Sequence, residues 1–367
     1  MIRVLHVLDE LRLSGVERRI LTAVDSWTSA GISTAVVATG AEVGPAVQRF
    51  DDAGVAVHHV PYRPRPGYVR DLAALARTHA DVVQFHTERA FIHSELACRA
   101  VGCAVIHSPC TVIQIGGLWR ARRIVQRWLA RRAGVEMVTI GDSVHENERV
   151  HFKNPSRIIR NYINTQRFAV GDRGAARLAI GIEGERLVIC SVGNCLGYKN
   201  HSEMFEAVGL WGGTRDDWTF LHAGHEIETG ERELVESLGI ADRCRFLGPV
   251  DDPATVLRAA DVFVMPSLSE GLGNAALEAA SCGLTLVLTN VAGLRDLKGH
   301  VELAIWTDTD AESIAAGLEG AADQARKVEP QQRARQHDAV KRTFGVERGA
   351  AEYAELYREI GSSRRGR

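Results

Sequence analysis

The chain has 367 residues, a length that favours two domains of average size over a single hydrophobic core. Its 44 Lys and Arg residues nearly balance 46 Asp and Glu residues, and this net charge of −2 predicts no nucleic-acid partner. The longest apolar runs fall well short of the ~20 residues that a membrane-spanning helix needs. Charge interrupts the N-terminal stretch MIRVLHVLDELRLSG too early for a secretion signal. Seven cysteines without C-x-x-C or Cys/His metal spacing predict reduced thiols, a cytoplasmic protein and no metal site.

Short apolar runs alternate with helical stretches along the whole chain. In chain order they are IRVLHVL, STAVVAT, VAVHHVP, DVVQFHT, AVIHSPC and EMVTIGD in the first half, then RLVICSVG, WTFLHAG, RCRFLGPV, DVFVMPS and LTLVLTN in the second. Continuous Val/Ile/Leu runs separated by helices are typical of parallel sheets covered on both faces. The sequence therefore predicts an α/β protein with two doubly wound, Rossmann-like domains.

The regular rhythm lapses near residues 160–174, and we expect the domain boundary there. This predicts a first domain over residues 1–162 and a second over residues 163–345. The closing segment, residues 346–367, contains the amphipathic helix AAEYAELYREI, which we expect to pack back on the first domain. Its arginine-rich tail is expected to be disordered.

Ligands of open α/β sheets bind at the carboxyl ends of the strands. If the two domains face each other, the loops at these ends border one interdomain cleft. The first such loop, DELRLSGVE, carries Gly15, where backbone amides can hold a phosphate or simply form an ordinary strand-to-helix turn. His86 lies in DVVQFHT, at the end of the predicted strand, where it serves either as a hydrogen-bonding partner of a sugar hydroxyl or as a buried structural residue.

The loop SVGNCLGYKNH follows the first strand of the second half and contains Lys199. A lysine beside a glycine turn at a sheet edge can neutralise a diphosphate, and the interaction strengthens as charge grows on a leaving group. The alternative is a solvated lysine after a turn.

The stretch SLSEGLGNAALEAASCG predicts a glycine turn and then a helix, with Asn274 as its N-cap and Gly283 as its stop signal. Glu270 precedes the turn, and Glu278 is expected in the first helical turn, where the helix dipole favours a carboxylate by about 0.3–1 kcal/mol. The helix dipole does not explain why an acidic residue stands on each side of the turn. The backbone amides of Gly271, Leu272 and Gly273 line this turn. Carboxylates bind vicinal hydroxyls and amides bind phosphates, so the pattern suits a nucleotide sugar.

These motifs resemble those of glycosyltransferase family 4, whose members are retaining enzymes with the GT-B fold. Glu270 through Glu278 matches the E-x(7)-E motif of the family, and EAASCGLTLVLTNVAGLRDL resembles its EAMACGxPVVATxxGGxxEL segment. The resemblance implies that Glu270 contacts the donor sugar and that Glu278 binds the ribose. FLGPVDD resembles the family's FLGxVxD segment, which implies that the backbone near Val250 borders the base.

The first half resembles the same family less closely. SGVER resembles its GGxER loop, RIIRNYINTQRF resembles its VIPNGVDxxxF hinge, and His86 falls on the histidine that contacts the transferred sugar. Two departures affect the donor site: Ser14 replaces the first glycine of the opening loop, and Asn194 replaces an arginine that helps to hold the diphosphate. Lys199 keeps the family's lysine, so one of two diphosphate cations remains.

The resemblance implies a GT-B fold, with two Rossmann-like domains facing an interdomain cleft, and a retaining hexosyltransferase of glycan, glycolipid or natural-product synthesis. The donor is expected to be a nucleotide diphosphate sugar, most simply a UDP-sugar, used as a substrate, with no cofactor and no metal. The implied catalytic residues are His86, Lys199 and Glu270. The implied donor-binding residues are Gly15, Asn194, Lys199, Val250, Glu270, Gly271, Leu272, Gly273, Asn274 and Glu278. Two alternatives stay open: a non-catalytic nucleotide-sugar binder, which Asn194 favours, and a GT-B epimerase, which the E-x(7)-E motif disfavours.

The stretch LWRARRIVQRWLARR, Leu118–Arg132, bears on the acceptor, which is a sugar, a lipid-linked sugar or a small molecule. It places Ile124, Val125, Trp128 and Leu129 on one helical face, with arginines around them. Such a helix either lies on an anionic membrane, at the inner face for a cytoplasmic enzyme, or packs its apolar face on a sheet.

Overall fold

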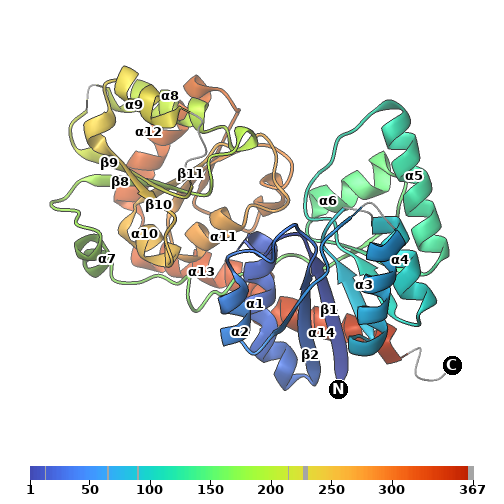
Figure 1. The fold of residues 1–367 in the computed structure, drawn as a ribbon. Helices are drawn as coiled ribbons and strands as arrows, with labels where there is room; N and C mark the ends of the chain where they lie inside the picture. Colours follow the sequence, from blue (N-terminus) through green and yellow to red (C-terminus); the bar gives the residue numbers. More distant parts are fainter. Residues whose placement is uncertain (13, 64–65, 89–90, 214, 226–229, 363–367) are drawn as a thin grey trace. The chain divides into compact units, whose positions relative to one another are not determined.

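The computed structural model describes residues 1–12, 14–63, 66–88, 91–213, 215–225 and 230–362. The chain divides into two compact units, and each is a three-layer α/β structure (Figure 1). The first unit joins Met1–Tyr162 to the segment that begins at Val346, and the second consists of Ile163–Gly345. The tail predicted to be disordered, residues 363–367, lies outside the described residues.

All neighbouring strands of the first unit are parallel, in the order β3-β2-β1-β4-β5-β6-β7. The strands are β1 (Ile2–Leu8), β2 (Ile32–Ala38), β3 (Ala56–His59), β4 (Val82–Phe85), β5 (Ala104–His107), β6 (Val135–Thr139) and β7 (Arg157–Ile158). The chain moves outward from β1 in one direction and then in the other, so the strand order reverses between β1 and β4. Doubly wound folds bind their ligands at the carboxyl ends of the two strands beside this reversal.

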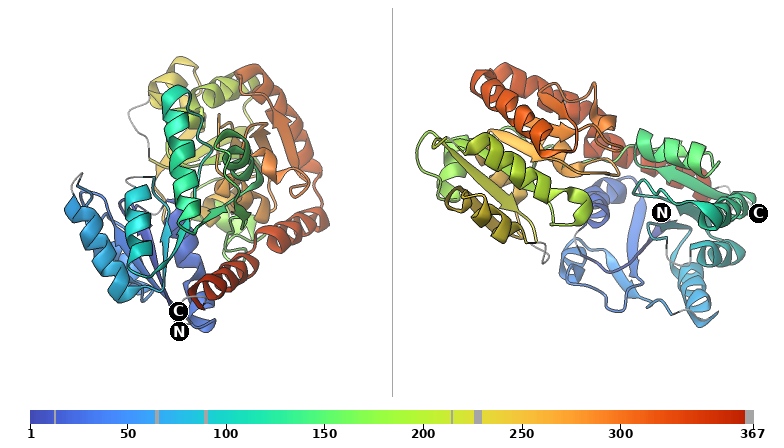
Figure 2. Two further views of the ribbon diagram at one scale, coloured as in Figure 1. Left: turned by 90° about the vertical axis from the view of Figure 1, so that its right-hand side faces the viewer. Right: turned by 90° about the horizontal axis from the view of Figure 1, so that it is seen from above.

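Helices lie on both faces of this sheet (Figure 2). They are α1 (Gly15–Ser29), α2 (Val47–Asp52), α3 (Pro66–His79), α4 (Phe91–Ala100), α5 (Gly117–Arg132), α6 (Asp142–Glu146), the π-helix η1 (Asn147–His151) and α14 (Val346–Ser362). The successive residues Val4 and Leu5 belong to two different hydrophobic clusters, because side chains alternate between the faces of a strand. The cluster of Val4 contains α1 and α14, and the cluster of Leu5 contains α3 and α4.

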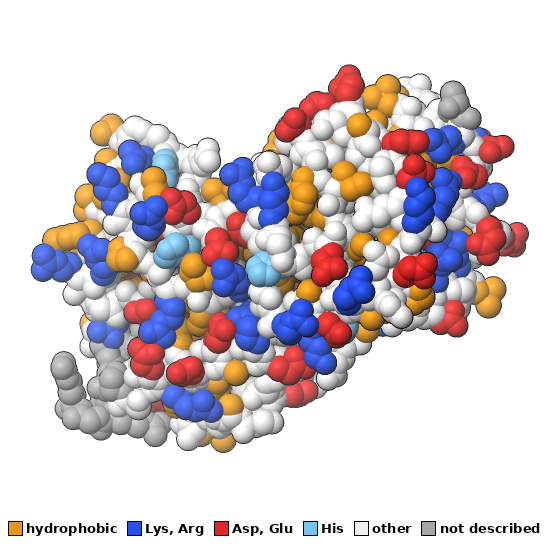
Figure 3. Space-filling view, turned by 180° about the vertical axis from the view of Figure 1, so that it is seen from behind, with side chains coloured by type: hydrophobic (Ala, Val, Ile, Leu, Met, Phe, Trp, Pro, Cys, Tyr) orange, Lys and Arg blue, Asp and Glu red, His pale blue; other side chains and the backbone are white. Residues whose placement is uncertain are grey.

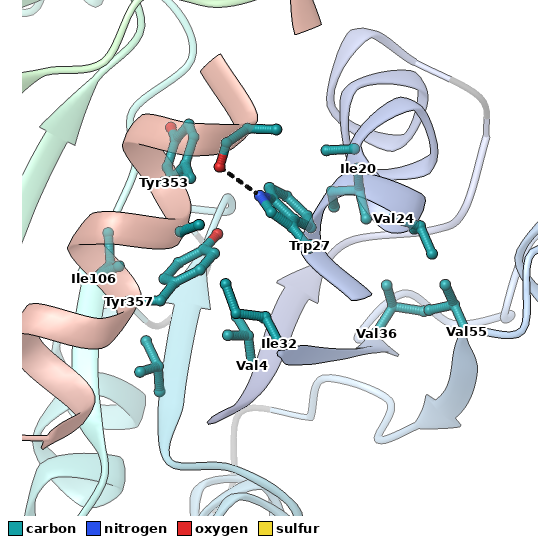
Figure 4. Packing of buried hydrophobic residues seen from close by; sticks show 14 of the residues in the cluster. Val4, Ile20, Val24, Trp27, Ile32, Val36, Val55, Ile106, Tyr353 and Tyr357 are labelled. Atoms are coloured by element: carbon teal, nitrogen blue, oxygen red, sulfur yellow. Dashed lines mark hydrogen bonds between the residues drawn. The ribbon is translucent and has the colours of Figure 1, made fainter. Parts of the chain in front are cut away.

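Aromatic side chains join α14 to α1. Trp27 of α1 is buried, donates a hydrogen bond from Nε1 to the carbonyl oxygen of Ala350 (3.1 Å), and meets the ring of Tyr357 edge to face (Figure 4). Helix α14 is longer than the predicted stretch AAEYAELYREI and begins at Val346. The closing helix therefore completes the core of the first unit.

A glycine in α14 allows the helix to approach Tyr162 closely. A Cβ atom on Gly349 would lie 2.1 Å from Cδ1 of Tyr162, which is itself buried. We expect Gly349→Ala to lower the free energy of unfolding by about 1–3 kcal/mol, because overpacking forces a backbone or side-chain shift. Gly361→Ala in the same helix is the matched control, since its Cβ would meet Ile2 at an ordinary 3.4 Å. Denaturant unfolding compares the two variants, and equal stabilities would contradict the packing argument.

The second unit repeats the topology of the first, with a parallel sheet in the order β10-β9-β8-β11-β12-β13. Its strands are β8 (Leu187–Val192), β9 (Trp218–Ala223), β10 (Cys244–Gly248), β11 (Val262–Met265), β12 (Thr285–Thr289) and β13 (Ala304–Thr307). The strand order here reverses between β8 and β11. Each of the predicted apolar runs contains one strand, which confirms two doubly wound α/β domains, but β7 and β13 were not predicted.

The helices of the second unit also cover both faces of their sheet. They are α7 (Arg173–Ala179), α8 (His201–Gly212), α9 (Glu231–Ser237), α10 (Pro253–Ala259), α11 (Asn274–Ser281), α12 (Ala311–Lys327) and α13 (Pro330–Phe344), with 3-10 turns η2 (Gly197–Lys199), η3 (Ala241–Arg243) and η4 (Arg295–Leu297). Helices α8 and α12 share a cluster with the buried rings of Phe205, Trp218 and Phe220. This core holds β8 in place, and the loop after β8 starts from it.

Acidic and basic side chains are interspersed over the face shown in Figure 3. That distribution agrees with the near-zero net charge of the chain. Among the described helices, none combines the length and the apolar character needed to cross a membrane.

Candidate active site

In the second unit, the loops that follow β8 and β11 meet at the carboxyl edge of the sheet. The amide of Leu268 donates to the carbonyl oxygen of Tyr198 (2.8 Å), and the side-chain amide of Asn200 donates to the carbonyl oxygens of Pro266 (3.2 Å) and Thr309 (2.8 Å). Asn200 has a left-handed backbone (φ 61°), which asparagine tolerates better than most residues. The two loops beside the strand-order reversal are therefore fixed to each other.

Lys199 and Glu270 form an ion pair across these loops. The ammonium nitrogen of Lys199 lies 2.6 Å from Oε1 of Glu270, and the buried hydroxyl of Ser267 donates to the same oxygen (2.8 Å). The side chains of Lys199 and Glu270 are only 17% and 11% exposed. Water screens such a pair less than it screens a surface pair, so both charges are held in a defined place. Two residues predicted separately from the sequence thus lie side by side.

The backbone of Glu270 is held from its other side by the segment after β12. Its amide donates to the carbonyl oxygen of Ala292 (3.0 Å), and Gly293 lies against its carbonyl group. Gly293 has φ +83°, and a Cβ atom there would lie 2.3 Å from the oxygen of Glu270. Only glycine fits both the conformation and the space, so this contact fixes the position of the carboxylate.

Helix α11 begins one residue earlier than the sequence predicted. Gly273, with φ 74°, occupies the N-cap position, and Asn274 is the first helical residue, so the prediction of an Asn274 N-cap was wrong. Glu278 is the fifth residue of the helix and half-buried, and the prediction that it lies in the first turn was also wrong. The helix stops as predicted, with Gly283 at φ +81° directly after the C-cap. Gly271 and Leu272 are buried between Glu270 and the helix.

Asn194 follows β8 and Val250 follows β10, and β9 lies between these two strands in the sheet. Asn194 is exposed, and its Oδ1 accepts a hydrogen bond from the amide of His225 (3.0 Å), which joins the loops after β8 and β9. Val250 is half-buried in the segment between β10 and α10. The side chain of Asn194 therefore takes part in loop structure.

His86 and Gly15 belong to the first unit, at the carboxyl ends of β4 and β1. Gly15 is the first residue of α1, after the N-cap Ser14. Both ring nitrogens of His86 already have partners: Nε2 lies 3.0 Å from Nδ1 of His6, and Nδ1 lies 3.1 Å from a guanidinium nitrogen of Arg19. Burial, and after it the charge on Arg19, hold the pKa of His86 well below its usual range. At neutral pH the residue is a neutral imidazole engaged by protein groups.

The predicted amphipathic helix, α5, buries one of its arginines, Arg127, and exposes its two tryptophans. The side chain of Arg127 is buried and contacts both oxygens of Glu148 (3.0 Å each) and Oε1 of Glu88 (2.7 Å). Trp119 is 69% exposed and Trp128 is 45% exposed. The exposed apolar set is Leu118, Trp119, Val125, Trp128 and Leu129. The interpretation as a helix with its apolar face packed on the sheet is therefore wrong.

Sequence reasoning missed a buried thiol and two imidazoles in the second unit. Cys195 and His201 flank Lys199 in the chain, and His222 lies in β9. Their ligand atoms all lie within 4.8 Å of one another. A search for metal-ligand spacing along one segment does not find this group, because its third member comes from the next strand. The sequence also carries no signal for Ser267, because its hydrogen bond to Glu270 depends on how the loop folds.

Comparison with known proteins shows what the second unit and the whole fold are similar to. Residues 172–338 match the family described as Glycosyl transferases group 1. A relative, D-inositol 3-phosphate glycosyltransferase of Mycobacterium ulcerans (strain Agy99), is 29% identical over 206 residues, which are 54% of this chain and 44% of the relative. The aligned part of the chain thus spans less than half the length of that curated relative.

Two solved structures show the fold over nearly the whole chain. A glycosyltransferase from Rickettsia africae ESF-5 superposes with a TM-score of 0.82 at 16% identity, covering 97% of this chain and 98% of its own. Anabaena Alr3699/HepE, solved in complex with UDP and glucose, superposes with a TM-score of 0.84 at 14% identity. The superposition covers 97% of this chain and 99% of the Anabaena chain. The expected GT-B fold of two Rossmann-like domains is confirmed. Within the second unit, residues 172–338 are thus similar to the glycosyl transferases group 1 family.

Proposed function

We propose that the protein transfers a sugar from a nucleotide diphosphate sugar, with UDP as the nucleotide, to an acceptor hydroxyl with retention of anomeric configuration. The observation that carries this proposal is the ion pair of Lys199 and Glu270, which lies at the strand-order reversal of the second unit. A structural neighbour that was solved with UDP and glucose supports the choice of nucleotide.

The two charges have complementary tasks in this proposal. Without a donor, Lys199 and Glu270 neutralise each other at 2.6 Å. A donor diphosphate competes for the ammonium group of Lys199, and Glu270 becomes free to accept hydrogen bonds from sugar hydroxyls while Ser267 keeps its carboxylate in place. As the glycosidic bond breaks, negative charge grows on the diphosphate, and the attraction to Lys199 strengthens in the transition state.

The remaining donor contacts follow the expectations from the sequence. The amides of Gly271, Leu272 and Gly273 face the phosphates, Asn274 lies beside them, and Glu278 binds the ribose. Asn194 and Val250 border the phosphates and the base, and Gly15 approaches the diphosphate from the first unit. His86 contacts the transferred sugar, and for this contact Arg19 has to release Nδ1 of the ring. The nucleotide sugar is a substrate, and the reaction as proposed uses neither a cofactor nor a metal.

The stereochemical outcome tests the reaction class. We expect the enzyme to convert a UDP-α-sugar into an α-linked product, or into the α-sugar when water is the acceptor. Nuclear magnetic resonance of the anomeric proton, recorded before mutarotation, distinguishes the two anomers. A β-configured first product would contradict retention, and isomerised UDP-sugar without any release of UDP would support the epimerase alternative.

We further propose that the exposed face of α5 contacts an anionic membrane, where a lipid-linked acceptor resides. Two tryptophans and three aliphatic residues are exposed on this helix, and arginines surround them. Basic helices with exposed aromatic residues bind at the headgroup boundary through apolar burial and charge. The arrangement also explains why the helix carries its apolar residues outward.

Vesicle sedimentation tests the membrane contact. We expect the protein to sediment with anionic vesicles, and we expect Trp119→Ala with Trp128→Ala to weaken binding tenfold or more, because each buried large apolar side chain contributes about 1.5–3 kcal/mol. The matched control replaces Leu178 and Leu210, which are 82% and 62% exposed in the second unit. High salt should also weaken binding. Equal binding of both double variants, or no binding of the wild type, would contradict the proposal.

A further inference from the structure

Three buried side chains that can bind a metal ion lie close together beside Lys199: Cys195, His201 and His222. Sγ of Cys195 is 3.3 Å from Nε2 of His222, and the rings of His201 and His222 meet edge to face with centroids 4.9 Å apart. One ligand atom from each of the three residues lies within 4.8 Å of the other two. All three side chains are buried: Cys195 and His222 are fully enclosed and His201 is 7% exposed.

A hydrogen bond orients one of the two imidazole rings of the group. The hydroxyl of Ser191 lies 2.7 Å from Nδ1 of His222, and this contact directs Nε2 toward Cys195. Metal-binding histidines are commonly oriented in this way by a partner on the other ring nitrogen. Nδ1 of His201 is buried and has no hydrogen-bond partner among the residues that the structure describes. A buried polar atom without a partner costs free energy, and a bound ion removes that cost.

The chemistry of the three donors selects the kind of ion. One thiolate and two neutral imidazoles are typical ligands of Zn²⁺ and disfavour Mg²⁺ and Ca²⁺, which prefer oxygen. With Zn–S and Zn–N bonds of ~2.3 and ~2.0 Å, the widest-spaced donors need to approach each other by roughly an ångström.

We propose that Cys195, His201 and His222 bind one Zn²⁺ ion as a structural site. Binding forms one Zn–S and two Zn–N bonds, and the thiol of Cys195 releases its proton to solvent. Three protein donors leave one position of a tetrahedral ion for water. Cys195 precedes Lys199 by four residues and His201 follows it by two, so the ion ties both ends of this loop to β9. The site fixes the backbone of Lys199 and takes no part in the transfer, and the inference is independent of the proposed function.

Cobalt substitution tests the site on the full-length protein. After treatment with a chelator and a reductant, the protein is titrated with Co²⁺ alone, followed by Zn²⁺ in competition. We expect one ion per chain, a thiolate-to-cobalt charge-transfer band, and loss of that band when Zn²⁺ is added. Cys195→Ser should lack the band, whereas Cys244→Ser, which removes a half-buried thiol outside the group, should keep it. Absence of the band in the wild type, or an unchanged band in Cys195→Ser, would overturn the proposal.

A second variant separates metal binding from a folding defect. Ser191→Ala keeps all three donors and removes only the hydroxyl that orients His222. We expect it to fold and to bind Co²⁺ with about 10–100-fold lower affinity, as is typical when a partner of a ligating histidine is lost. Circular dichroism verifies the fold of each variant. Unchanged affinity in folded Ser191→Ala would show that His222 is not a ligand and would overturn the three-residue site.

Discussion

Glu270→Ala is expected to reduce sugar transfer by about 100-fold or more while UDP still binds, because misplacing the reacting sugar by about an ångström costs a rate factor of that size. In the structure the carboxylate of Glu270 is held by Ser267, by Lys199 and by the backbone contact at Gly293. These contacts fix it where a donor sugar is expected. Steady-state kinetics with a UDP-sugar, together with calorimetric titration of UDP, measure the two effects separately.

Glu278→Ala is the matched comparison, since Glu278 lies eight residues further along, on α11. We expect this variant to weaken the binding of UDP itself, because the residue is proposed to bind the ribose. The transfer rate of Glu270→Gln should lie between those of the wild type and Glu270→Ala, since the substitution keeps the shape of the side chain and removes its charge. Equal affinity of the Glu270 and Glu278 variants for UDP would contradict this division of roles.

Lys199→Met is expected to lower kcat by about 10²–10³-fold, the usual cost of removing one group that stabilises charge in a transition state. The effect should be large here because Asn194 stands in place of the family's second diphosphate cation and its side chain already accepts a bond from His225. We also expect the variant to bind UDP more weakly and uridine unchanged, because the lost interaction is with the phosphates.

Two measurements keep this prediction specific. Lys341→Met removes an exposed lysine of the same unit and should leave kcat and nucleotide affinity unchanged. Thermal unfolding of Lys199→Met is needed as well, because the substitution leaves the carboxylate of Glu270, which is 11% exposed, without its cation. A folded Lys199→Met variant with wild-type kcat would show that this residue does not stabilise the leaving diphosphate.

The architecture could be predicted from the sequence because fully buried parallel strands leave continuous apolar runs. DVFVMPS and RLVICSVG, for example, contain β11 and β8, and these strands fix where the loops of Lys199 and Glu270 begin. Strands with weaker apolar character could not be found in this way. Strand β7 has only two residues, and β13 lies at the edge of its sheet with three of its four residues half-buried.

The errors at the site arise from interactions between segments. The position of Gly273 at the N-cap depends on its left-handed backbone, whereas the capping preference of asparagine acts only locally. The periodicity of α5 leaves open whether its apolar face packs on the sheet or on a membrane. In the structure Arg127 is buried against Glu88 and Glu148, and the two tryptophans of the helix are exposed. The contacts of Ser267 with Glu270 and of Cys195 with His222 could not be predicted, because they form only when the loops are folded.

The most direct test of the central claim is binding and hydrolysis across a panel of UDP-, GDP-, ADP- and dTDP-sugars without an acceptor. Thermal shift reports binding, and released nucleotide reports turnover. We predict that one UDP-sugar stabilises the protein and is slowly hydrolysed, and that Lys199→Met abolishes the hydrolysis. Binding of none of these sugars would contradict the account, because the edge of β8 and β11 would then hold no donor and a non-catalytic role would replace the transferase.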